Sequence, residues 1–266
     1  MIGAALLLLV AEPLAAPAPF PSAPAAMPSH FAPPLHRPMT YRVTSRRLSR
    51  DGTMVSYTLV YALRWDSAGR GVQLAATLRR IESDARPELA QALTGLLRPL
   101  VGQTLTYLVA PDGSGVDLID PDAQWARVLG KVQDMGASAA RAEAKQIASL
   151  LAALPPAERD KLATSDIRAL VAPANPAVPV ASDETAGVTL TQDGNRRFVT
   201  KVERSALEGT TSGTPKQLRM ATSWTIDTAT GLVMGESRKT WMAGAAGTDE
   251  RLVEESVRAL AEGDPG

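Results

Sequence analysis

Apolar and polar residues alternate most regularly over residues 54–65, "MVSYTLVYALRW". Every second position there is apolar or aromatic: Val55, Tyr57, Leu59, Tyr61, Leu63 and Trp65. A period of two is typical of a strand with one buried face. Turn sequences at 51–52 and 66–71 join this strand to the neighbouring segments 39–50 and 72–82. The pattern therefore predicts a three-stranded antiparallel meander.

Helical spacing of apolar residues follows in two places. Leucines recur at this spacing over residues 87–100, which predicts a short helix. Residues 103–120 then predict two short strands around a Pro-Asp-Gly-Ser-Gly turn, and a helical insertion follows at about 121–171. The first helix of the insertion carries an apolar stripe, which favours a core-facing side over a ligand pocket: Trp125, Val128, Leu129, Val132 and Met135.

Strand patterns resume after a Pro-rich connector at 172–182 and continue to the C-terminal region. We expect strands within 187–192, 196–207, 216–226 and 232–242, joined by turns or short loops. The last segment, 249–260, fits a strand or a helix, and the short preceding connections favour a closing strand. The polar stretch Asp227–Gly231 is interpreted as a turn, with Asp227 bonding the backbone and Gly231 at positive φ, and not as a reactive site.

Together these elements predict an α+β fold: a curved antiparallel β-sheet or unclosed barrel with the helical insertion packed against it. We assign residues 39–266 to one such domain.

The N-terminal region predicts export. Residues 1–18 contain a short apolar run followed by small residues, as in a secretory signal peptide. Residues 19–38 are rich in Pro and Ala and predict an extended, partly disordered tether. We expect a periplasmic or secreted protein with no transmembrane segment in the mature chain. The alternative is a cytosolic protein with an apolar N-terminal arm.

Composition argues against several function classes. The 28 basic and 28 acidic residues cancel, so no net field favours nucleic acid. Cysteine is absent, which excludes thiolate catalysis and Cys-ligated metals. The two histidines, His30 and His36, both lie in the predicted tether. Because histidine is the usual general base and a common metal ligand, we expect no enzyme, no metal site and no cofactor.

The remaining charged clusters have simpler explanations. Acidic residues at 117–122 and 183–184 lie where turns and helix caps need carboxylates, so we do not assign them to a catalytic pair. A group of arginines is interpreted as a solvated sheet edge, with an anionic partner as the alternative: Arg46, Arg47, Arg50, Arg79 and Arg80.

The phrases "TYLVAPDGSGVDLID" and "SWTIDTATGLVMGESRKTW" resemble segments of uncharacterised exported bacterial proteins. The order of elements also resembles the unclosed β-barrel with a helical lid found in periplasmic lipoprotein carriers. That resemblance implies an apolar concavity plugged by the inserted helices, with an acyl chain or lipoprotein anchor as ligand. No carrier motif matches residue by residue, so no site residue is transferred from it.

Two functions follow as hypotheses. In the first, a non-enzymatic envelope protein binds a hydrophobic or lipid-like ligand, through aromatic residues on the inner sheet face and the helix over it. In the second, the protein is a structural or assembly component of the envelope without a small-molecule ligand. The candidate ligand-binding residues of the first hypothesis are Tyr57, Tyr61, Trp65, Trp125 and Trp224.

Overall fold

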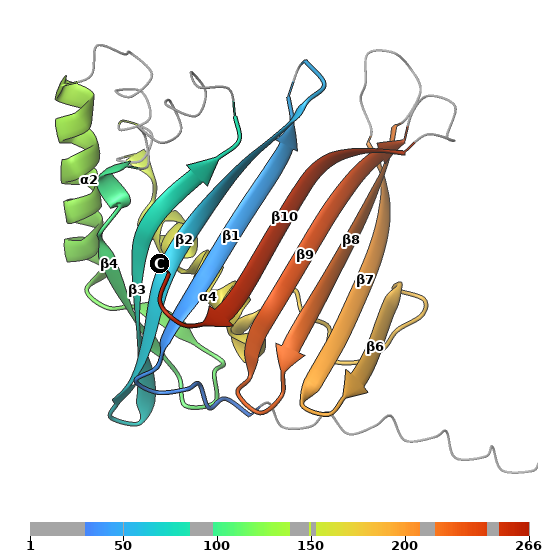
Figure 1. Ribbon diagram of the computed structural model, residues 1–266, viewed down its shortest axis with the longest axis horizontal. Helices are drawn as coiled ribbons and strands as arrows, with labels where there is room; N and C mark the ends of the chain where they lie inside the picture. The colour runs from blue at the N-terminus through green and yellow to red at the C-terminus, as the bar shows by residue number, and fades with distance from the viewer. Residues whose placement is uncertain are drawn as a thin grey trace, which may run out of the picture.

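The computed structural model of the chain describes residues 30–49, 51–85, 98–138, 149, 153–207, 216–243 and 250–265. Within these ranges the dominant feature is one antiparallel sheet of ten strands (Figure 1). The strands are β1 (Pro38–Leu48), β2 (Met54–Ala68), β3 (Gly71–Ser83), β4 (Thr104–Val109), β5 (Val116–Leu118), β6 (Val188–Asp193), β7 (Arg196–Leu207), β8 (Lys216–Asp227), β9 (Leu232–Ala243) and β10 (Glu250–Glu262).

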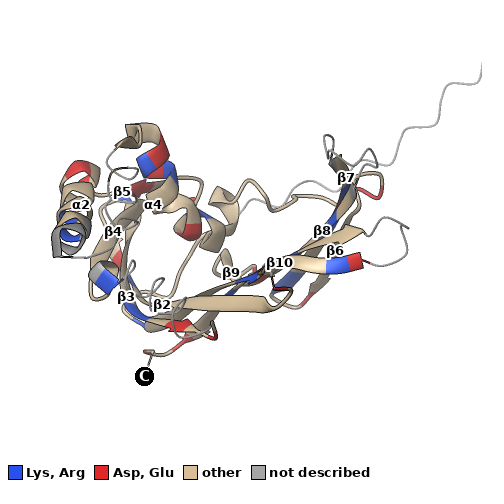
Figure 2. Cartoon of the chain, turned by 90° about the horizontal axis from the view of Figure 1, so that it is seen from above, with Lys and Arg blue, Asp and Glu red and all other residues tan. Residues whose placement is uncertain are grey.

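The strand order is β5-β4-β3-β2-β1-β10-β9-β8-β7-β6. This order confirms the predicted N-terminal meander and the later run of hairpins, and it shows that the last segment is a strand. The two runs meet in the middle of the sheet, where β1 pairs with β10 and Tyr41 lies opposite Leu260. β5 and β6 remain as the two edges, so the sheet is curved but not closed into a barrel (Figure 2).

Two helices cover part of the concave face (Figure 2). They are α2 (Pro121–Ser138) and α4 (Pro156–Leu170), and they confirm the predicted helical insertion. Short 3₁₀ turns lie at Arg98–Leu100 and Ala172–Ala174. Most of the helix predicted at 87–100 lies outside the described residues. Among the helices that are described, none has the length and apolar character needed to cross a membrane.

Alternation along the strands separates a mostly apolar concave face from a charged convex face. On β1, for example, Met39, Tyr41 and Val43 are buried on the concave side, whereas Arg42 and Arg46 lie on the other. A shift of one residue would exchange these two sets, so burial of the concave face determines the strand register.

The arginine cluster does not lie at a sheet edge, which corrects the sequence interpretation. β1 is a central strand, and Arg46 and Arg47 form cross-strand ion pairs with Glu255 and Glu254 of β10. Arg80 bonds Glu82 two residues further along the same strand, β3, which is also a central strand. Opposite charges on neighbouring strands stabilise their pairing. Sequence pattern alone could not reveal these partners because the β1–β10 pairing joins residues more than two hundred positions apart. Arg50 is outside the described residues.

Two hydrophobic clusters fill the concave face. The larger lies between α4, β1 to β5 and the ends of β9 and β10, and includes Trp65, Leu170 and Leu232. The smaller lies under the connector after α4 and is built around Val199, Trp224 and Ile226. The sheet is therefore continuous in its backbone but divided in its core.

Residues 30–37 belong to the folded part, although the sequence predicted a tether up to residue 38. Phe31 is buried and packs edge-on against Trp65, with ring centroids 5.7 Å apart. The backbone N–H of His36 donates to the carbonyl of Trp65 at 2.7 Å. An aromatic side chain and a backbone donor thus fix a segment whose proline content alone suggested an extended tether.

Candidate functional site

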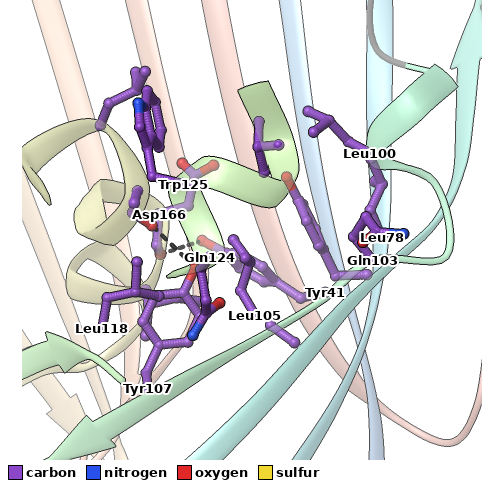
Figure 3. Close-up of a pocket in the computed structure, with 16 residues that line it drawn as sticks. Tyr41, Leu78, Leu100, Gln103, Leu105, Tyr107, Leu118, Gln124, Trp125 and Asp166 are labelled. Atoms are coloured by element: carbon purple, nitrogen blue, oxygen red, sulfur yellow. Dashed lines mark hydrogen bonds between the residues drawn. The ribbon is translucent and has the colours of Figure 1, made fainter. Parts of the chain in front are cut away.

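A cavity of about 380 Å³ lies between the concave face of β1 to β5 and the helices α2 and α4 (Figure 3). Its volume is within the range of about 300–1,000 Å³ typical of small-molecule sites. The lining is mainly aliphatic and aromatic: Tyr41, Tyr61, Ala76, Leu78, Leu100, Gln103, Leu105, Tyr107, Leu118, Gln124, Trp125, Val128, Leu162, Ala163, Asp166 and Ile167.

Two of the lining tyrosines connect the sheet to α4. The Tyr41 hydroxyl donates to the backbone carbonyl of Asp166 at 3.2 Å, and the Tyr107 hydroxyl donates to that of Ala163 at 3.0 Å. Burial raises the pKa of Tyr41, Tyr61 and Tyr107 well above the ordinary value for a phenol. The three rings therefore stay neutral, and they make the sheet side of the cavity a weakly polar aromatic wall.

Gln124 contributes a polar group from the first turn of α2. The residue is only 4% exposed, and its amide nitrogen donates to the backbone carbonyls of Ile119 and Thr106. The amide oxygen, Oε1, has no partner within the described structure. The indole nitrogen of the neighbouring Trp125 is also buried and unpartnered. Both atoms are buried inside the protein, although their residues contribute to the lining of the cavity.

A partly buried ion network lies under α4 beside the cavity. The Arg258 guanidinium bonds Glu236 at 2.9 Å and Asp166 at 3.0 Å, and so joins β10, β9 and α4. Burial raises the pKa of Glu236, although Arg258 acts in the opposite direction. Burial alone would lower the pKa of Arg258, but Glu236, Tyr41 and Asp166 outweigh it and the pKa is raised. The arginine therefore remains charged, and its position holds α4 over the sheet.

The five aromatic residues predicted as a ligand site are dispersed by the fold. Tyr61 and Trp125 line the cavity from opposite walls. Tyr57 shares the concave face of β2 with Tyr61 but is not among the lining residues. Trp65 is fully buried in the larger cluster, and Trp224 is buried in the smaller one. The cavity brings two of the five together, and ligand binding by any of them remains a prediction.

The helical stripe that sequence analysis assigned to the core contributes to the cavity through Trp125 and Val128. Arg159 of α4 lies over the Trp125 ring, 5.8 Å from its centroid, so the indole is held between the two helices. Side chains of Val132 and Met135, predicted in the same stripe, lie outside the described part of the structure. Spacing could identify the apolar side of this helix, but not that the side would meet a cavity.

Tyr41, Tyr107 and Gln124 were not selected from the sequence. Tyr41 and Tyr107 occupy inward positions of β1 and β4, and alternation within "TYRV" and "TLTYLV" was the only signal available for them. Gln124 follows the strand–helix junction as a single polar residue and carries no motif.

The polar stretch after β8 is a turn, as predicted. One Asp227 oxygen accepts the backbone N–H of Ala229 at 2.9 Å and the other accepts the Thr230 hydroxyl at 2.9 Å. Gly231 has φ of 74°. Asp183 serves another turn, where it accepts bonds from Thr185 and Ala186 that lower the pKa of its carboxyl. The carboxylates of Asp227 and Asp183 thus stabilise turns of the backbone.

Comparison with known proteins gives little information about this chain. No protein-family model matches it, and no curated protein matches it. One similar solved structure is a domain assigned to an outer membrane lipoprotein-sorting protein of Vibrio parahaemolyticus. It is 8% identical, with 85% of each chain covered and a TM-score of 0.18. A likeness at this level carries no argument about fold or function.

Proposed function

We propose that the protein is a non-enzymatic, exported binding protein that holds a hydrophobic, lipid-like ligand in the cavity between the sheet and the helices α2 and α4. The observation that carries the proposal is the cavity itself, about 380 Å³ of mainly apolar space beneath two helices. Cores are normally packed to a density that leaves few voids larger than a water molecule. An apolar space of this size is therefore better explained as a binding site than as a packing defect.

The side chains that line the cavity support binding of an alkyl chain rather than its chemical conversion. A water molecule takes up about 30 Å³ in the liquid, so the cavity has room for on the order of ten groups of that size. Apart from Asp166, whose carboxylate bonds Arg258, the described lining consists of neutral side chains. Chains of methylene groups gain about 0.8 kcal/mol for each group removed from water, so a short alkyl or acyl chain is favoured.

The proposed location in the bacterial envelope rests on residues 1–18, which read as a signal peptide. An exported protein that shields an alkyl chain would serve as a carrier or sensor of lipid-like molecules. The competing function, a structural envelope protein without a ligand, is tested by the same experiment.

Binding of phenylnaphthylamine, an uncharged dye whose fluorescence increases in apolar surroundings, provides the test. Ala163 lines the cavity on α4, whereas Ala157 is exposed on the same helix. We expect wild type to bind the dye and Ala163→Phe to lose binding at least about tenfold, because the added ring fills the cavity. Ala157→Phe adds the same ring outside and should bind as wild type does.

Far-UV circular dichroism and thermal melting check that both variants fold. If folded Ala163→Phe retains full dye affinity, the dye binds elsewhere and the cavity proposal is wrong. Failure of the wild type to bind the dye or any alkyl probe would instead favour the structural function.

A further inference from the structure

A single carboxylate, that of Asp166 on α4, gives the cavity a chemical preference beyond its apolar wall. Asp166 is the one charged side chain among the described lining residues (Figure 3). Its Oδ1 accepts a bond from Arg258 at 3.0 Å. The other oxygen, Oδ2, has no partner among the described residues, and it is not one of the fully buried unpartnered atoms. The side chain is 33% exposed, so a bound molecule can reach this oxygen.

Arg258 does not cancel the negative charge at this wall. The same guanidinium also bonds Glu236 at 2.9 Å, so two carboxylates share one positive group. Neither lysine nor arginine occurs among the described lining residues. The chain as a whole has a formal net charge of zero, so no general field competes with this local one. The cavity therefore has a negative electrostatic potential close to Asp166.

The tyrosines of the sheet wall add acceptors and aromatic faces to this carboxylate. The rings of Tyr41 and Tyr61 have centroids 6.4 Å apart, and both line the cavity. Burial is the main cause of the raised pKa of the three lining tyrosines, and the negative charge of Asp166 adds to it in each. The field of the carboxylate thus reaches all three phenol groups. Phenol oxygens accept hydrogen bonds, and aromatic faces attract cations.

These groups favour one kind of head group over two others. A carboxylate or phosphate head would meet a like charge without a positive partner in the described lining. A hydroxyl head would make one ordinary hydrogen bond. An ammonium head would lose part of its hydration, but a carboxylate, phenol oxygens and the Gln103 carbonyl are present to replace the lost water.

We propose that the cavity binds an alkyl chain that ends in a primary ammonium group, with this group bonded to the Asp166 carboxylate at Oδ2. Long-chain primary amines are the simplest members of this ligand class. The inference rests on the proposed function, because it specifies the head group of the ligand held in the same cavity.

The test compares three probes that share a ten-carbon chain: decylamine, decanol and decanoate. At pH 7 the amine is cationic, the alcohol is neutral and the acid is anionic. Displacement of phenylnaphthylamine measures their affinities for the wild-type protein. A charge-assisted hydrogen bond is stronger than a neutral one, so decylamine should bind about tenfold more tightly than decanol. Decanoate should bind more weakly than decanol.

Two aspartates on α4 provide the variant and its matched control. Asp166→Asn removes the charge but keeps the backbone carbonyl that accepts from Tyr41, and it should bind decylamine and decanol within about twofold of one another. Asp160 pairs with Arg168 and is not among the lining residues. Asp160→Asn makes the same change of charge on the same helix and should keep the wild-type preference for the amine.

The outcomes separate this inference from the proposed function. Decanol or decanoate binding as tightly as decylamine to wild type overturns the inference, while the cavity still binds alkyl chains. An amine preference that persists in folded Asp166→Asn overturns it as well. Absence of binding by every probe overturns both proposals.

The inference stays testable if Asp166→Asn, which loses its bond to Arg258, does not fold. Ala163→Phe, which fills the cavity, should then lose decylamine together with the dye. Full retention of decylamine by folded Ala163→Phe would show that the amine binds outside the cavity, and the inference would be wrong.

Discussion

At the scale of single residues, Gly231 shows that a turn can be required by packing as well as by backbone geometry. Its φ of 74° lies in the left-handed region that favours glycine. A Cβ placed on it would lie 2.3 Å from the carbonyl oxygen of His30. The neighbouring Thr230 carbonyl accepts the backbone N–H of Ala32. The turn after β8 is thus the surface on which the N-terminal segment lies.

This double constraint gives a prediction with a matched control. Gly231→Ala should lower the free energy of unfolding by more than about 2 kcal/mol, because a strained φ and a backbone clash both act. Gly194 has φ of 55° in the β6–β7 turn, but a Cβ there would meet no atom within 4 Å. Gly194→Ala should therefore cost only about 1 kcal/mol. Urea unfolding of both variants measures the difference, and equal losses would show that the contact with His30 is unimportant.

At the scale of elements, the positions of the strands could be predicted from the sequence. The meeting of distant strands and helices at the cavity could not. Alternation in segments such as "MVSYTLVYALRW" follows directly from burial of one strand face, so nearly every strand lies where the pattern predicts it. The cavity depends instead on contacts between distant segments: Tyr41 from β1, Tyr107 from β4 and Gln124 from α2. No local pattern encodes such a meeting. The same limitation explains why the Arg46 and Arg47 ion pairs were mistaken for a sheet edge.

Aromatic content was likewise a poor guide to the site, because large rings serve cores as well as pockets. Trp65 and Trp224 occupy every-second positions of their strands just as Tyr61 does, yet each is buried in a separate cluster. What distinguishes Tyr61 is its position under the helices, which only the arrangement of elements determines.

The network that joins β9, β10 and α4 makes a pH-dependent contribution to stability. Burial raises the pKa of Glu236 above its unfolded value, with Arg258 and Arg238 opposing this and Asp166 adding to it. A carboxyl whose pKa is raised in the folded state contributes stability that is fully present below the unfolded pKa. This contribution is lost as pH rises through the folded pKa.

Glu236→Gln removes the titrating group while keeping an oxygen that can accept from Arg258. We expect the stability of the variant relative to wild type to increase as pH rises from about 4 towards neutrality. Urea unfolding at a series of pH values measures the difference. A difference that moves in the opposite direction would mean that attraction to Arg258 outweighs the burial of the carboxyl.

At the scale of the whole molecule, one continuous sheet supports two unequal cores. The β1–β5 half is covered by α4 and the larger cluster, whereas β7 and β8 are covered mainly by the connector after α4, through Ala172 and Val178. Backbone hydrogen bonds continue across the middle, where β1 pairs with β10. Apolar burial supplies most of the stabilisation of a sheet face, so the two halves should differ in local stability.

Native-state hydrogen exchange tests this division. β2 and β8 are suitable for comparison because each pairs with a strand on both sides, so edge effects do not separate them. Amides of β2 opposite the larger cluster should exchange at least about tenfold more slowly than those of β8 opposite the smaller one. Trp224→Phe should speed exchange in β7 and β8 more than in β2, because these strands share its cluster. Equal protection in both halves, with equal response to that substitution, would show instead that the β1–β10 pairing makes the ten strands one cooperative unit.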